Sequence, residues 1–149
     1  MQAETIPDEI AKGLQDAEMP MEELLSVLEA VDLAAGETLF ECGDEARGAF
    51  FVHSGRLAVH RKTGFGNRTQ VVALLDAGTP VGEGGLLAGQ KRSATVRAVS
   101  STRLSFLSTD NFSLLCQKYP LFGLQVQRWI LKCLSLRLLA STERLVRIM

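Results

Sequence analysis

The segment from Gly82 to Val96 holds the residues of this chain that are best suited to bind an anion. Glycines let a backbone approach a ligand and turn where a Cβ atom would clash, and here they stand at Gly82, Gly84 and Gly85. The run after Glu83 is long enough for one helical turn, whose first amides would point at an anion. Arg92 adds a planar guanidinium that can donate to two phosphate oxygens, and Ser93 adds a hydroxyl and an amide. The sequence therefore predicts a phosphate-binding loop.

Glu83 indicates what else the ligand carries. A carboxylate beside a phosphate is repulsive unless it accepts hydrogen bonds from another group, and a sugar hydroxyl is the obvious donor. A carboxylate for a ribose, with amides and Arg92 for a phosphate, indicates a compact nucleotide. A short glycine-rich turn and a glutamate and an arginine nine positions apart also occur on ordinary protein surfaces. The interpretation therefore depends on the strands predicted on both sides of the segment.

Two stretches of this segment carry a resemblance to a known family. They read Val81-Gly82-Glu83-Gly84-Gly85-Leu86 and Arg92-Ser93-Ala94-Thr95-Val96. They resemble the phosphate cassette of the cyclic-nucleotide-binding domain family, which includes the catabolite activator protein and the regulatory subunits of cyclic-AMP-dependent kinase. The spacing is similar to the kinase type, and shorter matches at 35–37, 43–44 and 54–56 extend the resemblance over most of the chain.

The resemblance implies a role for each matching residue. Glu83 would hold the ribose 2′-hydroxyl, Arg92 the exocyclic phosphate oxygens, and Ser93 with the amides of Gly84 and Gly85 the remaining oxygens. Gly82 and Ala94 complete the implied binding set. The ligand would be cyclic AMP or cyclic GMP, because Ser93 lies between the alanine common in sites for the first and the threonine common in sites for the second. No cofactor is expected.

The same comparison shows two departures from the family pattern. Val81 replaces the usual aromatic residue, and the pair Gly84-Gly85 replaces larger residues. We expect the glycine pair to loosen the cassette and weaken its affinity for the ligand. Neither departure removes a charged contact.

The elements that must position these residues follow from the hydrophobic pattern. Apolar residues at helical spacing predict one amphipathic helix over residues 20–31. Frequent glycines then cut the chain into short strands, predicted at 49–62 with a turn at Ser54-Gly55, at 69–75, at 95–99 and at 103–107. Helices return after Ser108, and Tyr119-Pro120 separates the first of them from a long last helix.

This order predicts a mainly β fold with flanking helices. The expected architecture is a double-stranded β-helix, or jelly roll, with an N-terminal helix, a short helix in the cassette and a long C-terminal helix. We predict a single domain over residues 1–149. It divides into an N-terminal helical arm (1–32), a β-roll (33–108) that carries the cassette (82–96), and C-terminal helices (109–149).

The last helix carries a possible dimer interface. The stripe of a coiled-coil seam, broken by one polar residue, runs through Leu131, Leu134, Leu138, Ser141, Leu145 and Ile148. Such a stripe can also pack on the chain's own β-roll. A second apolar face, however, is offered by Trp129, Ile130, Cys133, Leu136 and Leu139. We therefore expect a homodimer in which one face meets the roll and the other a second copy.

The polar break in this seam has a possible function. The run Ser141-Thr142-Glu143-Arg144 resembles a stretch of the catabolite activator whose hydroxyls reach the adenine base. By that resemblance Ser141 and Thr142 form a lid over the ligand, one of them across the dimer, and Thr142 favours cyclic AMP. A serine and threonine pair that merely tolerates a helix is the alternative. A lid of this kind would reposition the helix when ligand binds.

Composition limits the remaining classes of protein. Residues 1–37 carry ten acids against Lys12 alone, and the basic residues after Leu121 are sparse, so direct DNA binding is not expected. A DNA-binding module of the catabolite activator type would also have to follow Met149. Three cysteines without paired spacing and the lack of a signal-like N-terminus favour the cytoplasm, and charged residues interrupt every apolar run long enough for a membrane.

The sequence shows no recognisable set of catalytic residues. A jelly-roll metalloenzyme needs a cluster of histidine and carboxylate ligands, whereas His53 and His60 stand seven positions apart around a turn. We therefore predict a regulatory sensor of cyclic nucleotide that signals through its last helix to an unidentified partner protein. The alternative is a degenerate domain that binds no nucleotide and serves as a scaffold for dimerisation.

Overall fold

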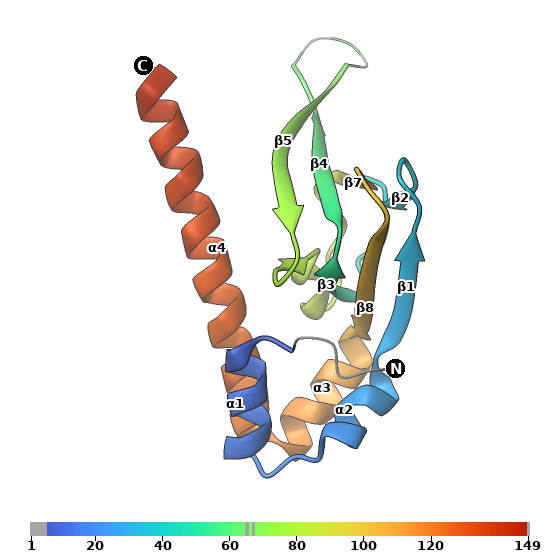
Figure 1. The fold of residues 1–149 in the computed structure, drawn as a ribbon, viewed down its shortest axis with the longest axis vertical. Helices are drawn as coiled ribbons and strands as arrows, with labels where there is room; N and C mark the ends of the chain where they lie inside the picture. Colours follow the sequence, from blue (N-terminus) through green and yellow to red (C-terminus); the bar gives the residue numbers. More distant parts are fainter. Residues whose placement is uncertain (1–5, 65, 67, 149) are drawn as a thin grey trace.

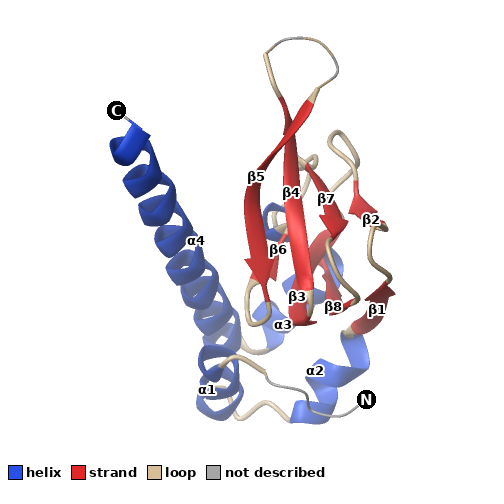
Figure 2. Cartoon of the chain, turned by 45° about the horizontal axis from the view of Figure 1, so that its top comes forward, coloured by secondary structure: helices blue, strands red, loops and turns tan. Residues whose placement is uncertain are grey.

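Two antiparallel sheets of four strands form the body of the molecule in the computed structural model, which describes residues 6–64, 66 and 68–148 (Figures 1 and 2). The first sheet has the order β1 (Glu29–Leu33), β8 (Thr102–Ser108), β3 (Gly48–Ser54) and β6 (Pro80–Val81). The second has the order β2 (Thr38–Phe40), β7 (Thr95–Ala98), β4 (Arg56–Lys62) and β5 (Thr69–Asp76). The predicted mainly β jelly roll with flanking helices is confirmed.

The core of this β-roll lies between the two sheets. Each sheet buries its apolar face against the other. The buried residues come from both sheets: Leu33, Phe50, Val52, Leu57, Leu75, Val81, Val96, Ala98 and Leu104. Val81, which stands where the family has an aromatic residue, is 1% exposed within this cluster. A β-branched side chain therefore fills the core position directly before the cassette.

The connection at Ser54-Gly55 passes from one sheet to the other. Strand β3 pairs with β6 and β8, whereas β4 pairs with β5 and β7, so the two predicted strands are neighbours in sequence but not a hairpin. Gly55 has a φ of +94°, and a Cβ atom there would lie 2.4 Å from the Ser101 carbonyl oxygen. This corner requires glycine.

The N-terminal helical arm differs from the predicted one. Two helices occur, α1 (Asp8–Asp16), which was not predicted, and α2 (Met21–Val27). The predicted helix over residues 20–31 was too long at its C-terminal end, because residues 29–33 pair with β8 as strand β1. The sheet supplies partners for the backbone of this segment, and this tertiary pairing overrides the local helical spacing.

The C-terminal helices begin where the sequence indicated. Helix α3 (Thr109–Lys118) is capped by Ser108, whose Oγ accepts a hydrogen bond from the Asn111 amide at 3.1 Å. Helix α4 (Pro120–Ile148) is 29 residues long and runs beside the roll on the side of β5 (Figure 1). No helix in the described part of the chain is both long and apolar enough to cross a bilayer.

Only the first half of α4 is packed into the core. Phe122, Val126 and Trp129 are buried, and the Trp129 ring lies 5.5 Å from the ring of Phe51 on β3. Helix α1 packs along this half, and the Glu9 carboxylate accepts a hydrogen bond from the Lys132 Nζ at 2.9 Å. The base of α4 is therefore fixed to both α1 and the first sheet.

The second half of α4 is mostly exposed, and the predicted seam is divided between two environments. Its exposed members lie on the solvent side of the helix: Leu131, Leu138, Leu145 and Ile148 are 59% to 82% exposed. Leu134 and Ser141 instead line a cavity against the roll. The predicted second face is also divided, since Trp129 is buried while Leu136 and Leu139 are 60% and 56% exposed. The expected division into one roll-facing and one partner-facing stripe was therefore wrong in detail.

Candidate functional site

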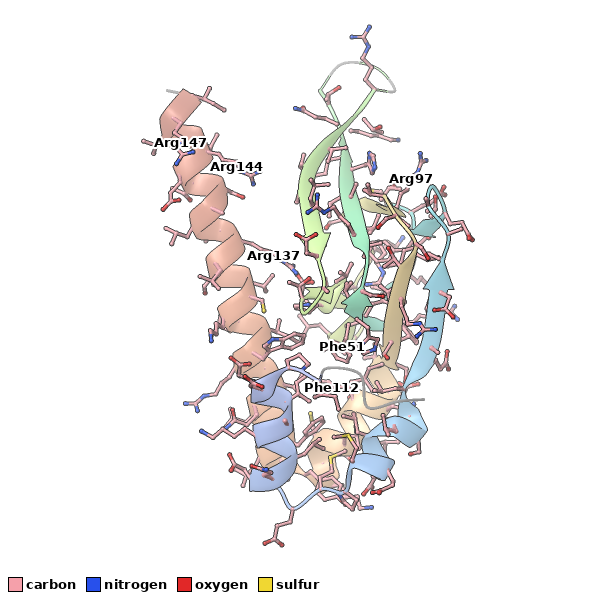
Figure 3. The ribbon with its side chains drawn as sticks, viewed as in Figure 1. Phe51, Arg97, Phe112, Arg137, Arg144 and Arg147 are labelled. Atoms are coloured by element: carbon pink, nitrogen blue, oxygen red, sulfur yellow. The ribbon has the colours of Figure 1, made fainter. Side chains whose placement is uncertain are left out.

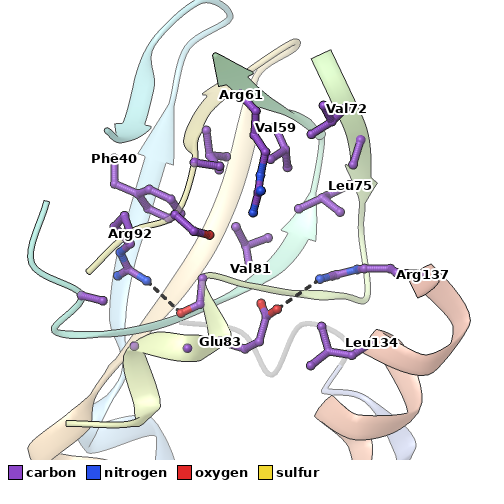
Figure 4. A pocket seen from close by; sticks show the side chains of 18 of the residues that line it. Phe40, Val59, Arg61, Val72, Leu75, Val81, Glu83, Arg92, Leu134 and Arg137 are labelled. Atoms are coloured by element: carbon purple, nitrogen blue, oxygen red, sulfur yellow. Dashed lines mark hydrogen bonds and ion pairs between the residues drawn. The ribbon is translucent and has the colours of Figure 1, made fainter. Parts of the chain in front are cut away.

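A cavity of about 430 Å³ lies between the cassette, the second sheet and α4 (Figure 4). We call it the pocket. Apolar side chains of the β-roll and Arg61 of β4 form one wall, and the other charged side chains belong to the cassette or lie beside it. Its lining is made by Phe40, Ala46, Val59, Arg61, Val72, Ala73, Leu75, Val81, Gly82, Glu83, Gly84, Gly85, Lys91, Arg92, Ser93, Ala94, Val96, Leu134, Arg137 and Ser141.

The first part of the cassette is a tight turn built by glycine. Gly82 follows β6 in the left-handed region, with a φ of +64°, and begins the single 3-10 turn η1 (Glu83–Leu86). A Cβ atom on Gly82 would lie 2.4 Å from the Arg92 Nη1. The Gly85 amide donates to the Gly82 carbonyl at 3.0 Å, so this amide closes the turn. The predicted helical turn after Glu83 is confirmed.

Gly85 has a reason of its own to be glycine. A Cβ atom at this position would lie 2.0 Å from the Gly48 carbonyl oxygen of β3, whereas at Gly84 it would meet nothing within 4 Å. The Thr109 hydroxyl donates to the Gly85 carbonyl from the start of α3. The expectation that the glycine pair loosens the cassette is therefore wrong for Gly85, which allows close packing of the turn on the first sheet.

Arg92 is buried at the edge of the pocket and is held by the protein itself. Its side chain is 7% exposed, and Nη1 and Nη2 donate to the carbonyls of Gly82 and Gly48, each at 2.8 Å. The guanidinium carbon lies 4.3 Å from the centroid of the Phe40 ring. A guanidinium has five N–H groups, and these contacts use two of them. Arg92 can therefore brace the cassette and still donate to an anion in the pocket.

Burial lowers the pKa of Arg92, and the negative charges of Asp44 and Glu83 partly offset this effect. Asp44 is held near because the Arg92 amide donates to its backbone carbonyl at 2.8 Å. An arginine side chain stays protonated in a protein despite a shift of this direction. The site therefore presents a fixed positive charge beside the glycine turn.

Glu83 also lines the pocket, and it pairs with Arg137 of α4. Its Oε1 is 3.7 Å from the Arg137 Nη1, and the two side chains are 22% and 28% exposed (Figure 4). Arg137 Nη2 also donates to the Pro80 carbonyl just before the cassette. The Glu83 carboxylate, which is expected to accept a hydrogen bond from a sugar hydroxyl, therefore also interacts with Arg137 of the last helix.

The remaining predicted site residues fall into two groups. Ser93, Ala94 and Ser141 line the pocket together with the cassette. Thr142 does not line it within this chain, and its hydroxyl donates to the Leu138 carbonyl at 2.9 Å in the preceding turn of α4. The structure thus brings eight of the nine predicted residues to one cavity and leaves Thr142 on the helix backbone.

Sequence reasoning missed four polar or aromatic residues of the pocket, namely Phe40, Arg61, Lys91 and Arg137. A signal for two of them was present. Arg61 stands two positions after Val59 on one strand, so both point to the same face. Arg137 stands one helical turn before Ser141, so both lie on the same face of α4. Four basic residues and one acid therefore surround this cavity, a balance that favours an anionic ligand.

Comparison with known proteins connects this geometry with a family. The sequence profile of the cyclic nucleotide-binding domain matches residues 30–119. Among curated proteins, the chain is 33% identical over 115 residues to the lysophospholipase NTE1 of Saccharomyces cerevisiae and 27% identical over 128 residues to an NTE family protein of Mycobacterium bovis. These matches cover 70% and 86% of this chain but only 7% and 21% of those proteins.

Solved structures share the fold. A cyclic nucleotide-binding domain from Methylobacillus flagellatus has a TM-score of 0.79 at 23% identity, and the match covers 95% of this chain and 83% of that one. The catabolite activator protein of Thermus thermophilus has a TM-score of 0.67 at 25% identity, with 98% and 61% covered. Because the family profile spans more than half of the chain and its matched range includes the cassette, the chain belongs to the cyclic nucleotide-binding domain family.

Proposed function

We propose that this domain is a regulatory sensor that binds cyclic AMP or cyclic GMP in the pocket. The observation that carries the proposal is the meeting of Glu83, Arg92 and the Gly82–Gly85 turn at one cavity. A phosphate would lie against the turn and the remaining N–H groups of Arg92, and the ribose hydroxyl would donate to Glu83. The apolar wall of the β-roll leaves room for the base.

The finer assignments belong to the same proposal. Cyclic AMP is favoured by the resemblance of Ser141-Thr142 to the base-reading stretch of the catabolite activator, and cyclic GMP stays possible. Thr142 would then act on the pocket of a second copy, since it does not line its own. We propose a cytoplasmic homodimer joined through α4, which acts in trans on a separate effector protein without binding DNA or a membrane.

The role assigned is regulatory rather than catalytic. The match to the lysophospholipases spans 7% of their length, so their activity is no guide to what this domain does. A ligand that contacts both the cassette and α4 can change the position of the helix by binding one arrangement more tightly than another. The signal would leave the domain through α4.

A second function is favoured by one specific observation. Arg92 donates to two backbone carbonyls, and Glu83 pairs with Arg137, so both charged residues already have partners within the protein. A domain that keeps these residues for its own stability could serve as a dimerisation scaffold and bind no nucleotide. The two functions differ in one measurable property: a sensor binds cyclic nucleotide and a scaffold does not.

Calorimetric titration separates them. Protein stripped of bound nucleotide by unfolding and refolding is titrated with cyclic AMP and with cyclic GMP. The sensor is expected to release or take up heat with at least one of them, and Glu83→Gln is expected to weaken binding about tenfold or more because a neutral amide accepts a weaker hydrogen bond. Absence of heat with both nucleotides, on protein shown by circular dichroism to be folded, would leave the scaffold as the function.

A further inference from the structure

Strand β5 is an edge of the second sheet with little protection against the addition of another strand. Among the described residues it pairs with β4 alone, so alternate N–H and C=O groups along its other edge have no strand partner. Natural edges are often blunted by lysine or proline, but residues 69–75 include no charged residue and no proline. One bulge lies at Val72, and pairing is regular from there to Asp76. Val71 and Leu74 are 48% and 53% exposed, so this edge is open and apolar.

A groove of about 470 Å³ lies between this edge and the second half of α4. We call it the β5 groove. Ala73, Leu74 and Leu75 line it from the strand. Because successive side chains of a strand point to opposite faces, three consecutive residues can line one groove only along the edge of the strand. Figures 1 and 2 both show α4 beside β5, so the free edge of β5 faces the helix across this groove.

The helical wall of the β5 groove is basic. Figure 3 shows Arg137 and Arg144 on the side of α4 that faces the roll. Arg144 donates to the Ser141 hydroxyl at 3.2 Å, and neither Arg144 nor Arg147 forms an ion pair with any residue that the structure describes. Three arginines and one glutamate give this wall a net positive charge, and its residues are Arg137, Ala140, Ser141, Glu143, Arg144 and Arg147.

We propose that the β5 groove binds an extended acidic segment of a partner protein, which joins the second sheet as a strand beside β5. The backbone of the segment would pair with the free edge, and its carboxylates would accept hydrogen bonds from the arginines of α4. The two walls agree in length, because Val71 to Leu75 spans roughly 13 Å of strand and Arg137 to Arg147 about 15 Å of helix. One segment of about five residues meets both walls. This inference goes beyond the proposed function and does not depend on nucleotide binding.

The charge of the β5 groove favours this occupant over a second copy of the chain. A second β5 placed along the edge would bring residues 69–75, which carry no charge, to a wall that has unpaired arginines. A nucleic acid would satisfy the arginines through its phosphates, but it has no peptide groups to pair with the edge of a sheet. An acidic peptide segment complements both the strand and the helix.

The first test measures binding of an acidic peptide without nucleotide. The probe is a fluorescent peptide of about eight residues in which glutamate and valine alternate, titrated by fluorescence anisotropy. Arg144→Gln/Arg147→Gln should bind it about three- to tenfold more weakly than the wild-type protein, because two ion pairs are lost. Arg97→Gln/Arg128→Gln removes two exposed arginines outside the groove and should match the wild type. A wild-type protein that does not bind the peptide at millimolar concentration, or equal affinities of the two double variants, would overturn the inference.

The second test addresses the pairing with β5. The same peptide with every backbone amide methylated keeps its charge but cannot donate to the strand, so its binding should be lost. Saturation with the unmodified peptide should slow amide hydrogen exchange in residues 71–75 of the wild-type protein. Equal affinity for the methylated peptide or for a single-stranded oligonucleotide of equal charge would show a general polyanion surface and overturn the inference.

Sedimentation analysis of Arg144→Gln/Arg147→Gln tests the remaining occupant. The oligomeric state should match that of the wild-type protein, and a change would assign the β5 groove to a second copy and overturn the inference. Because none of these measurements contains nucleotide, a failure of the proposed function in calorimetry and a failure of peptide binding are separate results.

Discussion

The guanidinium carbon of Arg92 lies 4.3 Å from the centroid of the Phe40 ring, while two of its nitrogens donate to carbonyls of β3 and of the cassette. One side chain thus joins β2, the start of β3 and the cassette. Its role in the fold and its proposed role in ligand binding have to be separated by experiment.

Replacing Arg92 by lysine should destabilise the protein as well as weaken binding. Lysine keeps the charge, but it lacks the planar fork that donates to Gly48 and Gly82 together and stacks on Phe40. A buried carbonyl left without its donor lowers the free energy of unfolding by about 1–3 kcal/mol. Urea denaturation measures this loss. Arg97→Lys, at an exposed position of β7, is the control, and equal midpoints for both variants would contradict the bracing role.

Replacement by alanine should lower the stability of the protein at Gly85 but not at Gly84. In Gly85→Ala the new Cβ atom meets the Gly48 carbonyl at 2.0 Å, so the turn has to move away from β3 at a cost of about 1–3 kcal/mol. In Gly84→Ala it meets nothing within 4 Å, and stability should stay within about 0.5 kcal/mol of the wild type. Thermal unfolding followed by circular dichroism compares them. A Gly85→Ala protein as stable as Gly84→Ala would refute the close packing described here.

Acid should loosen the helical end of the molecule through Glu23. The hydrogen bond from Lys118 and then that from Tyr119 lower the pKa of Glu23 below its ordinary value of 4.5. A carboxyl with a lowered folded-state pKa stabilises the fold above its unfolded-state pKa, and this stabilisation is lost as the pH falls through the folded-state pKa.

The wild-type free energy of unfolding should therefore decrease as the pH falls below about 4.5, and less steeply in Glu23→Gln. Urea titrations at several pH values give both slopes. Glu22→Gln, in the same turn of α2, is the matched control and should keep the wild-type slope. Identical slopes for Glu23→Gln and the wild type would exclude this contact as a source of acid sensitivity.

The exposed leucines of α4 should decide the oligomeric state. Leu131 and Leu138 are 65% and 70% exposed, and they stand one heptad apart on the solvent side of the helix. Sedimentation analysis should find a dimer for the wild type and a monomer for the double variant Leu131→Ser/Leu138→Ser. Leu114→Ser, which changes a leucine of α3 that is 60% exposed, should remain a dimer. A monomeric wild-type protein would remove the proposed interface.

The sequence was informative where spacing along the chain decides the structure. Glu83 and Arg92 could be placed at one site because their segment resembles the family's cassette and because only the turn η1 and a short loop separate them. The bounds of α3 could be predicted because the cap at Ser108 is a local interaction. The end of the predicted helix at residue 31 could not, since β1 exists only through its pairing with β8.

Contacts between distant segments account for the other errors. Nothing near Gly85 in sequence indicates that the Gly48 carbonyl lies against it. Likewise, the approach of Arg137 to Glu83 depends on how α4 leaves the core, and α1 and Trp129 determine that direction. Helical spacing alone put Leu131 and Leu134 on one stripe, although Leu131 is 65% exposed and Leu134 lies over the pocket.

The length of the mostly exposed second half of α4 has a mechanical consequence. The helix rises about 1.5 Å per residue, so the stretch from Trp129 to Ile148 is a lever of roughly 28 Å with its pivot in the core. A tilt of about 10° at the pivot would carry the free end through roughly 5 Å. A small rotation of the helix at its buried base would in this way become a much larger displacement at its exposed end.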